Sequence, residues 1–277
     1  MKNPAANLTG SATIFILDAR QNIWRRNFLG DEIFLRDGER LDDLMRSGRM
    51  IIQDAREFCF SMDAVLIAHF PHFKRNARVI DLGTGNGVIP PMIADDVREI
   101  CAVELNSRAA DLARRNVELN GLTEKISVVE GDYRKHREIF RAESFDAAIA
   151  NPPYTPVTNG AANQIVGIAR ARHEFTATLD DVVTAARYVL KFHGAFYMIH
   201  LASRLCEIVD ALHRRQMEMK RLRLIHPKPN RDANLLMLEA VVGANVGNLK
   251  ILPPLIVHND DGTYTDEVRK IYGLRLS

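Results

Sequence analysis

The residues best suited to chemistry lie in two short segments, each of which directly follows a run of apolar residues. The first, residues 81–87, is Asp-Leu-Gly-Thr-Gly-Asn-Gly, and the second, residues 151–154, is Asn-Pro-Pro-Tyr. Glycines at alternate positions, Gly83, Gly85 and Gly87, let the backbone approach a ligand closely and expose its N–H groups. Such a loop can hold a nucleotide pyrophosphate or an amino-acid carboxylate.

The glycine loop differs from the dinucleotide fingerprint G-x-G-x-x-G, because it is G-x-G-x-G with Asp81 directly upstream. This spacing favours S-adenosylmethionine, whose ammonium group a carboxylate can hold; another nucleotide site and a tight structural turn remain alternatives. Glu104 ends the next apolar run, where a carboxylate can accept from both ribose hydroxyls, and Asp132 follows the third, within reach of an adenine amino group. The predicted cofactor site comprises Asp81, Gly83, Thr84, Gly85, Gly87, Glu104, Leu105, Asp132, Tyr133 and Asn151.

The Asn-Pro-Pro-Tyr segment can present two hydrogen-bond acceptors to one amino group, although such a segment alone can also be a rigid turn. Methylation of a planar amine requires the nitrogen lone pair to leave conjugation. The Asn151 side-chain oxygen and the Pro152 carbonyl can each accept one N–H and so favour the tetrahedral nitrogen of the transition state. Pro153 stiffens the turn and Tyr154 can stack on a ring. We predict these four residues to be catalytic, with alignment in place of a general base.

Between residues 78 and 200, short apolar runs alternate with amphipathic stretches, which is typical of parallel strands joined by helices. Strands are predicted at Val79–Leu82, Ile100–Val103, Ile126–Val129, Phe145–Ala150, Ala195–Ile199, Arg221–Ile225 and Leu235–Val242. Helices are predicted after an N-cap at Ser61 and at Ser107–Leu119, Thr178–Leu190, about Ala202–Arg215 and Asp266–Tyr272. The last two strands are expected to form an antiparallel edge hairpin. The residues before Ser61 show no clear strand–helix alternation.

Composition excludes several classes of protein. The chain has 277 residues, of which 47% are hydrophobic and 26% charged, so disordered, collagen-like and coiled-coil structures are poor interpretations. Its three cysteines share no C-x-x-C spacing, which argues against a disulfide framework or a cysteine zinc site. No window reaches the roughly 18 apolar residues that a membrane span needs. We expect a cytoplasmic protein that binds no metal and no membrane, with a monomer favoured.

Positive charge is concentrated in short segments, although the net charge is only +2. Residues 213–231 contain seven Lys or Arg residues and a single acid, and residues 134–141 and 36–49 form two smaller groups. Segregated positive charge is the expected footprint of a phosphate-binding surface, although any one group can equally be a solvated helix face. Strand alternation predicts that Arg221 and Arg223 point into solvent, with the leucines between and after them in the core.

Residues 81–87 together with residues 151–154 resemble class I, Rossmann-like methyltransferases that modify exocyclic or amide nitrogens. Over roughly residues 30 to 273, the chain resembles one family, the bacterial tRNA1(Val) adenine-N6 methyltransferases. The segments that carry this similarity are Ile52–Asp54, Phe60–Leu66, Ala171–Glu174, His226–Lys228, Leu252–Leu255 and Tyr264–Val268.

The resemblance implies an α/β, Rossmann-like fold: a mostly parallel, twisted seven-stranded sheet with helices on both faces and an antiparallel edge hairpin. It also implies a methyltransferase domain over residues 75–277, with residues 1–74 packed on it as an N-terminal elaboration. S-adenosylmethionine would be the cofactor, S-adenosylhomocysteine the product and tRNA the substrate, methylated on the adenosine after the anticodon. A polar segment, residues 155–169, is a candidate loop over a flipped base. The residues expected to bind substrate are Arg172, Arg214, Arg215, Arg221, Arg223 and Lys228.

Several other functions are compatible with the same motifs. A glutamine amide of a protein presents the same NH₂ geometry to Asn151, and guanine N2 of rRNA or adenine N6 of DNA are further candidate acceptors. A nucleotide- or RNA-binding protein without catalysis is a third class of function. The intact Asn151–Tyr154 segment argues against this class, because a retired active site has no need for two acceptors beside a cofactor loop.

Overall fold

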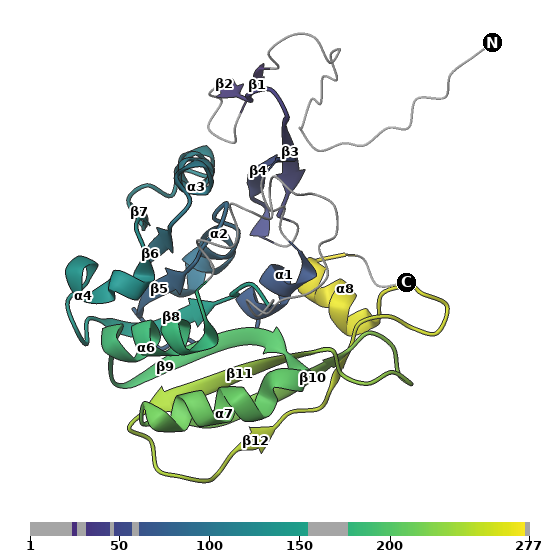
Figure 1. Cartoon of the computed structure of the whole chain (residues 1–277). Helices are drawn as coiled ribbons and strands as arrows, with labels where there is room; N and C mark the ends of the chain where they lie inside the picture. The colour runs from purple at the N-terminus through teal and green to yellow at the C-terminus, as the bar shows by residue number, and fades with distance from the viewer. Residues whose placement is uncertain (1–23, 27–31, 45–46, 57–60, 155–176, 275–277) are drawn as a thin grey trace, which may run out of the picture.

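The structure is a computed structural model that describes residues 24–26, 32–44, 47–56, 61–154 and 177–274, and it is built around one large sheet (Figure 1). The seven main strands are β5 (Arg78–Leu82), β6 (Glu99–Glu104), β7 (Ile126–Glu130), β8 (Phe145–Ala150), β9 (Leu190–Leu201), β10 (Met217–His226) and β11 (Leu235–Val242). Two strands of two residues each, β12 (Lys250–Ile251) and β13 (Leu255–Ile256), pair with β10. The strand order is β12-β10-β11-β9-β8-β5-β6-β7.

The predicted α/β fold is confirmed. Strands β5 to β9 are parallel to one another, and β11 runs antiparallel to both β9 and β10, which gives the expected edge hairpin. The small strands β12 and β13 were not predicted. Strand β9 begins at Leu190 and not at Ala195, because Leu190 already pairs with Phe145, before the register shifts to the pair of Ala147 and Ala195.

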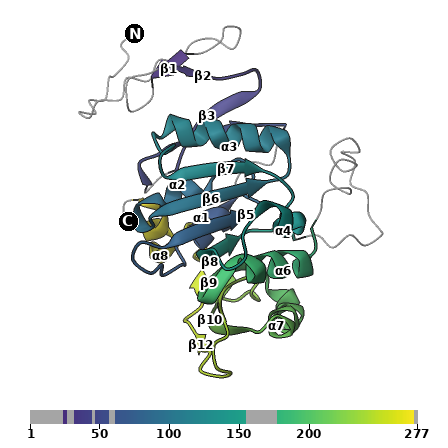
Figure 2. The same cartoon turned by 90° about the vertical axis from the view of Figure 1, so that its left-hand side faces the viewer.

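Helices cover both faces of the sheet. Figure 2 shows α4, α6 and α7 on one side and α2 and α8 on the other. The helices are α1 (Met62–Ala68), α2 (Ile89–Ile93), α3 (Ser107–Leu119), α4 (His136–Ile139), α6 (Leu179–Val189), α7 (Leu205–Arg214) and α8 (Asp266–Tyr272). Local capping explains several of their starts, because Asn106 and Thr265 accept from backbone N–H groups and Thr178 forms a capping box with Asp181.

Alternation along each strand divides the interior into two cores. On β5, Val79 belongs to the core that also contains buried residues of α1, α2 and α8, whereas Ile80 belongs to the core against α6 and α7. Both side chains are fully buried. This pattern is that of a sheet covered on both faces, and it fixes the direction in which each strand delivers the residue that follows it.

The region before α1 contains two hairpins, which the sequence did not predict. Strands β1 (Trp24–Arg26) and β2 (Glu32–Phe34) pair antiparallel, as do β3 (Glu39–Asp43) and β4 (Met50–Asp54). Four of the five residues of β3 are charged, so no alternation of apolar and polar residues marks it as a strand.

Asn116 of α3 and Asn120, which caps its C-terminus, attach the second hairpin to the rest of the protein. Asn116 accepts from the Ile52 N–H at 2.6 Å and donates to the Ile52 carbonyl at 3.1 Å. It also donates to the carbonyl of Asn86 in the glycine loop at 2.8 Å. One turn later, Asn120 makes the same pair of bonds to Met50. The two side-chain amides therefore hydrogen-bond to the backbone N–H and carbonyl groups of β4, as a neighbouring strand would.

We expect Asn116→Ala to lower the free energy of unfolding by about 1–3 kcal/mol, because it leaves buried backbone groups of Ile52 and Asn86 without partners. Urea unfolding measures this loss. Asn120→Ala is the matched control: its side chain is only partly buried, so water can replace its bonds and the loss should be smaller. Equal losses for the two variants would contradict this account.

Candidate active site

The two motifs meet where the sheet changes direction. The chain leaves β5 to build β6 and β7 on one side and later returns to place β8 on the other side of β5. Asp81 of β5 aligns with Ile149 of β8, so the glycine loop and the Asn-Pro-Pro-Tyr segment leave the sheet side by side. Ligands of open α/β sheets bind at such a reversal, outside the carboxyl ends of the strands.

The glycine loop is shaped for a close ligand. The three glycines of this loop have positive φ angles, which residues with a side chain rarely adopt: 80° at Gly83, 59° at Gly85 and 77° at Gly87. A Cβ on Gly85 would meet nothing within 4 Å, and one on Gly83 would meet only Tyr133, at 3.6 Å. A Cβ on Gly87, in contrast, would lie 2.9 Å from the Cβ of Ala113 in α3. The first two glycines therefore border open space, and the third lets the loop pack on a helix.

Asp81 supplies a buried carboxylate without a partner. The residue is 0% exposed, and both its carboxylate oxygens and the nearby Thr84 hydroxyl oxygen lack a hydrogen-bond partner among the described residues. Burial raises the pKa of Asp81 to about 7; the nearby Thr84 side chain offsets part of this rise, and the negative charge of Glu104 adds to it. Such an unpartnered group is costly in a folded protein unless a ligand satisfies it. A cationic group such as an amino-acid ammonium fits this site.

The two other predicted acids already have partners in the protein. Glu104 accepts from the backbone N–H groups of Gly85 and Asn106, both at 2.8 Å, and so shapes the glycine loop. Asp132 forms an ion pair with Arg134 at 2.7 Å, which lowers the pKa of its carboxyl. Each carboxylate retains lone pairs that ribose hydroxyls or an amino group can use. Leu105 is half-buried next to Glu104, and Tyr133 is buried.

Asn151 and Tyr154 form part of a cluster that sequence reasoning did not foresee. The Tyr154 hydroxyl oxygen lies 3.1 Å from Asn151 Oδ1 and 2.6 Å from Oδ2 of Asp63 in α1. The Tyr154 ring also lies 5.3 Å from the ring of His200 at the end of β9. Burial, aided by the charge of Arg204, lowers the pKa of His200 to about 4, so this ring is neutral. Pro152 is buried in the turn and Pro153 is exposed.

No local signal in the sequence identified Asp63 or His200, because both reach Tyr154 only through the tertiary fold. Asp63 lies within Phe60–Leu66, one of the segments similar to the tRNA methyltransferases, but nothing in its spacing links it to Tyr154. The predicted substrate residue Arg172 and the candidate loop at residues 155–169 lie outside the described residues.

The prediction that Arg221 and Arg223 point into solvent is wrong. Their side chains are only 15% and 17% exposed, and they pair with Glu239 and Glu267, at 2.7 and 2.6 Å. Arg221 also lies over the ring of Phe70. Strand alternation itself held, because Leu222 and Leu224 both pack in the core against α6 and α7. The face that carries the two arginines is covered by Phe70 and by α8, whose Glu267 pairs with Arg223.

The other predicted substrate residues differ in how firmly the protein engages them. Arg214 and Arg215 both pair with Asp180 at the start of α6, with the Arg214 side chain 52% exposed and that of Arg215 only 21%. Lys228 donates to the carbonyl of Asp260 at 3.2 Å. Arg214 also pairs with Asp210 of its own helix, and as the more exposed of the two arginines it is better placed to exchange these partners for a phosphate.

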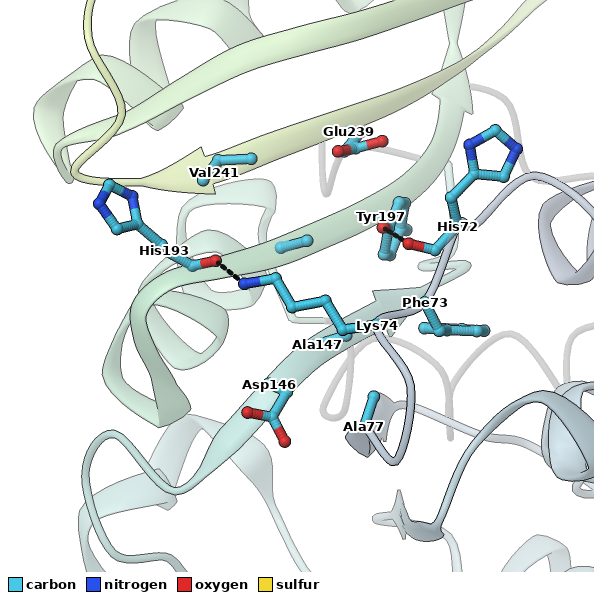
Figure 3. Close-up of a pocket in the computed structure, with 11 residues that line it drawn as sticks. His72, Phe73, Lys74, Ala77, Asp146, Ala147, His193, Tyr197, Glu239 and Val241 are labelled. Carbon is cyan, nitrogen blue, oxygen red and sulfur yellow. Dashed lines mark hydrogen bonds between the residues drawn. The ribbon is translucent and has the colours of Figure 1, made fainter.

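A cavity of about 260 Å³ lies at the other end of the strands (Figure 3). Its lining includes Asp146 near the start of β8 and Glu239 of β11, and each of these acids forms an ion pair with a basic residue. Lys74 points across it and donates to the carbonyl of His193 at 3.1 Å. With its charges paired, this cavity lacks the unsatisfied groups that mark the glycine loop.

Comparison with known proteins agrees with this geometry. The family model of the methyltransferase small domain matches residues 61–214. A tRNA1(Val) (adenine(37)-N6)-methyltransferase of Aeromonas hydrophila is 26% identical over 207 residues, which cover 74% of this chain and 84% of that protein. The protein of the same name from Vibrio vulnificus is 26% identical over 181 residues, covering 65% and 74% of the two chains.

Solved structures support the fold. A predicted O-methyltransferase from Agrobacterium tumefaciens superposes with a TM-score of 0.62 at 24% identity and covers 78% of this chain and 98% of its own. P. horikoshii TYW2, solved in complex with MeSAdo, superposes with a TM-score of 0.54 at 14% identity, over 78% of this chain and 75% of its own.

The fold and the site define an α/β methyltransferase of the Rossmann-like kind. The chain belongs to the methyltransferase small domain family, and the resemblance inferred from its motifs is confirmed. Membership of this family implies S-adenosylmethionine as the methyl donor. Within the described ranges, no helix is long and apolar enough to cross a membrane, and no three His, Cys, Asp or Glu side chains are grouped to hold a metal ion.

The raised pKa of Asp81 predicts how cofactor binding depends on pH. Below about pH 7 the Asp81 carboxyl is protonated in the unliganded protein, and its proton must leave before the carboxylate can pair with an ammonium group. The Kd of S-adenosylmethionine should therefore rise about tenfold for each pH unit below this value, and rise again above about pH 8, where the ligand's own α-amino group loses its proton. Calorimetric titration between pH 5 and 9 measures this dependence.

Two controls isolate the role of Asp81. Asp81→Asn should bind S-adenosylmethionine weakly and with little dependence on pH. 5′-Methylthioadenosine lacks the ammonium group, so its binding to the unaltered protein should not follow the Asp81 titration. If S-adenosylmethionine binds with the same pH profile to the protein and to Asp81→Asn, the ammonium group is held elsewhere.

Proposed function

We propose that this protein is an S-adenosylmethionine-dependent N-methyltransferase that methylates N6 of an adenosine in tRNA, with adenosine 37 of tRNA-Val as the substrate. The supporting observation is the adjacency of the Asn151–Tyr154 turn and the unpartnered Asp81 carboxylate at the β5/β8 reversal. The similarity to tRNA1(Val) (adenine(37)-N6)-methyltransferases supports the choice of tRNA and of adenine N6. A tRNA substrate also favours a cytoplasmic enzyme.

The cofactor site in this proposal consists of the glycine loop and the acids around it. S-adenosylmethionine, when bound, supplies the methyl group. Asp81 holds the ammonium group, because it is the buried carboxylate that lacks a partner. Glu104 accepts from ribose hydroxyls while it keeps the Gly85 N–H bond, and Asp132 accepts from the adenine amino group. Gly83 and Gly85 leave room for the ligand to approach the backbone.

The acceptor amine lies against the Asn-Pro-Pro-Tyr turn. The Asn151 side-chain oxygen and the Pro152 carbonyl each accept one N–H and stabilise the tetrahedral nitrogen more than the planar one. Pro153 stiffens this turn, and the Tyr154 ring borders the target base. Since the amine loses its proton after the methyl group has transferred, the residues need only hold and orient it.

The deciding experiment incubates the protein with labelled S-adenosylmethionine and total tRNA, in parallel with rRNA, DNA and a protein extract, and identifies the labelled nucleosides and amino acids by mass spectrometry. Labelled N6-methyladenosine in tRNA-Val is the expected product. Label in protein alone would favour glutamine methylation. Label in rRNA guanine or in DNA adenine would identify that nucleic acid as the substrate. Binding of tRNA with no label in any acceptor would favour a non-catalytic RNA-binding protein.

We expect Asn151→Ala to reduce kcat about 10²- to 10³-fold, because one of two pre-organised acceptors is lost. The Kd of S-adenosylmethionine, measured by calorimetry, should stay close to that of the unaltered protein, since Asn151 acts on the acceptor amine. Single-turnover kinetics with saturating tRNA measures the rate. A variant with near-normal turnover would refute the role given to Asn151.

Phosphate contacts can be tested with two arginines of the basic segment. Arg214 is half-exposed, so Arg214→Gln should lower the slope of log affinity for tRNA against log salt by about 0.7–0.9. Arg221→Gln should leave this slope unchanged and instead destabilise the fold, because Arg221 is paired with Glu239 and packed on Phe70. Identical salt slopes for Arg214→Gln and the unaltered protein would exclude Arg214 from the tRNA interface.

A further inference from the structure

We propose that Asp63 is a positioning residue that acts through Tyr154 to turn the amide oxygen of Asn151 toward the acceptor amine. This inference rests on the proposed N-methyltransferase function. It follows from the geometry of three side chains from two distant parts of the chain: Asp63 in α1 and Asn151 and Tyr154 in the turn after β8.

The Tyr154 hydroxyl group can donate its hydrogen to only one of its two neighbours. A tyrosine hydroxyl has one hydrogen to donate and lone pairs with which to accept. The Tyr154 oxygen is 2.6 Å from Asp63 Oδ2, a distance typical of a charge-assisted O–H···O⁻ bond, and 3.1 Å from Asn151 Oδ1. The carboxylate is the stronger acceptor and the closer one, so it takes the hydrogen. None is left for Asn151.

The amide of Asn151 therefore faces an oxygen that has no hydrogen to donate to it. With its hydrogen given to Asp63, the Tyr154 oxygen has only lone pairs to offer, and the amide oxygen opposite it would be repelled. A half-turn of the amide presents its NH₂ group instead, in nearly the same space, and makes a favourable N–H···O bond to Tyr154. The amide oxygen then lies on the other side of the group, away from Tyr154. In this orientation it can accept an N–H of the acceptor amine.

Asp63 is held in place by the packing of α1. Residues 64–68 of α1 are all buried, and α1 packs on α2, β9 and α8, so the carboxylate has a fixed position. The side chain of Thr265 caps α8, and Val268 of α8 is 0% exposed. The cap at Thr265 and the buried Val268 thus hold α8 against the helix that carries Asp63.

The kinetic test compares four variants. Asp63→Ala and Tyr154→Phe should each lower kcat by about 10- to 100-fold, the scale of a misplaced catalytic group, with the Kd of S-adenosylmethionine unchanged. Asp63→Asn keeps an acceptor for the tyrosine hydroxyl and should stay within about fivefold of the unaltered protein. The double variant Asp63→Ala/Tyr154→Phe should be no slower than the slower single variant, because both act through one hydrogen bond.

A control and a structural readout separate this role from a loss of folding. Asp266→Ala removes an exposed first-turn acid of α8 and should leave kcat unchanged. Thermal unfolding is measured for all variants. If the two single losses multiply in the double variant, or if Asp63→Asn is as slow as Asp63→Ala, the relay through Tyr154 is wrong.

A measurement without a substrate keeps this inference distinct from the proposed function. The side-chain NH₂ resonances of Asn151, assigned by their loss in Asn151→Asp, should shift in Tyr154→Phe and Asp63→Ala but not in Asp266→Ala. If no acceptor is methylated, the proposed function fails while this spectrum still decides the orientation of the amide. Asn151 resonances that do not respond to Tyr154→Phe would overturn the inference.

Discussion

The reversal of strand order between β5 and β8 is the constraint on which the site depends. Residues 81–87 and 151–154 are far apart in the chain, and they become neighbours only because β8 returns to the free side of β5. The two cores maintain this arrangement, since alternate residues of β5 face opposite layers of helices and hold the strand in one register. The loops after both strands consequently leave the same edge of the sheet, where the peptide groups have no further strand to pair with.

At this edge the unliganded site lowers the stability of the folded protein. A fully buried carboxylate without a hydrogen-bond partner destabilises the unliganded state, and burial raises the pKa of Asp81 to about 7 as a consequence. Glycines with positive φ at positions 83 and 85 add backbone entropy to the unfolded state without filling the space beside them. The compensation comes from elsewhere, for example from Asn116, which ties the glycine loop and the β3–β4 hairpin to α3. Polar groups that lack hydrogen-bond partners, on a loop that the rest of the protein holds in place, are typical of a binding site.

Much of this arrangement could be predicted from local sequence. The seven main strands follow from short apolar runs, and α8 has the predicted bounds, Asp266–Tyr272, because Thr265 caps it and Gly273 ends it in a left-handed conformation. Periodicity could not reveal β3, which is mostly charged, nor the extension of β9 to Leu190, where Lys191 and His193 interrupt the apolar pattern. Glu104 contacts the glycine loop through the N–H of Gly85, but the protein partners of Glu104 and Asp132 depend on loop conformation and had no signal in the sequence.

Long-range pairing explains why the same reasoning misplaced charge and overlooked Asp63. In residues 213–231 the sequence shows basic residues with one acid among them, yet the acids that pair with Arg221 and Arg223 come from β11 and α8. Charge density along a segment therefore overstates the charge that a surface presents, because partners distant in sequence neutralise part of it. The same distance hides Asp63 from Tyr154, 91 residues later. A hydrogen bond between two such residues has no periodicity and no spacing rule, and only the packing of α1 against the sheet determines that the tyrosine hydroxyl meets a carboxylate. In the proposed mechanism, architecture and catalytic geometry are thus linked at this one contact: α1 has to pack correctly for Asn151 to present its amide oxygen to the acceptor amine.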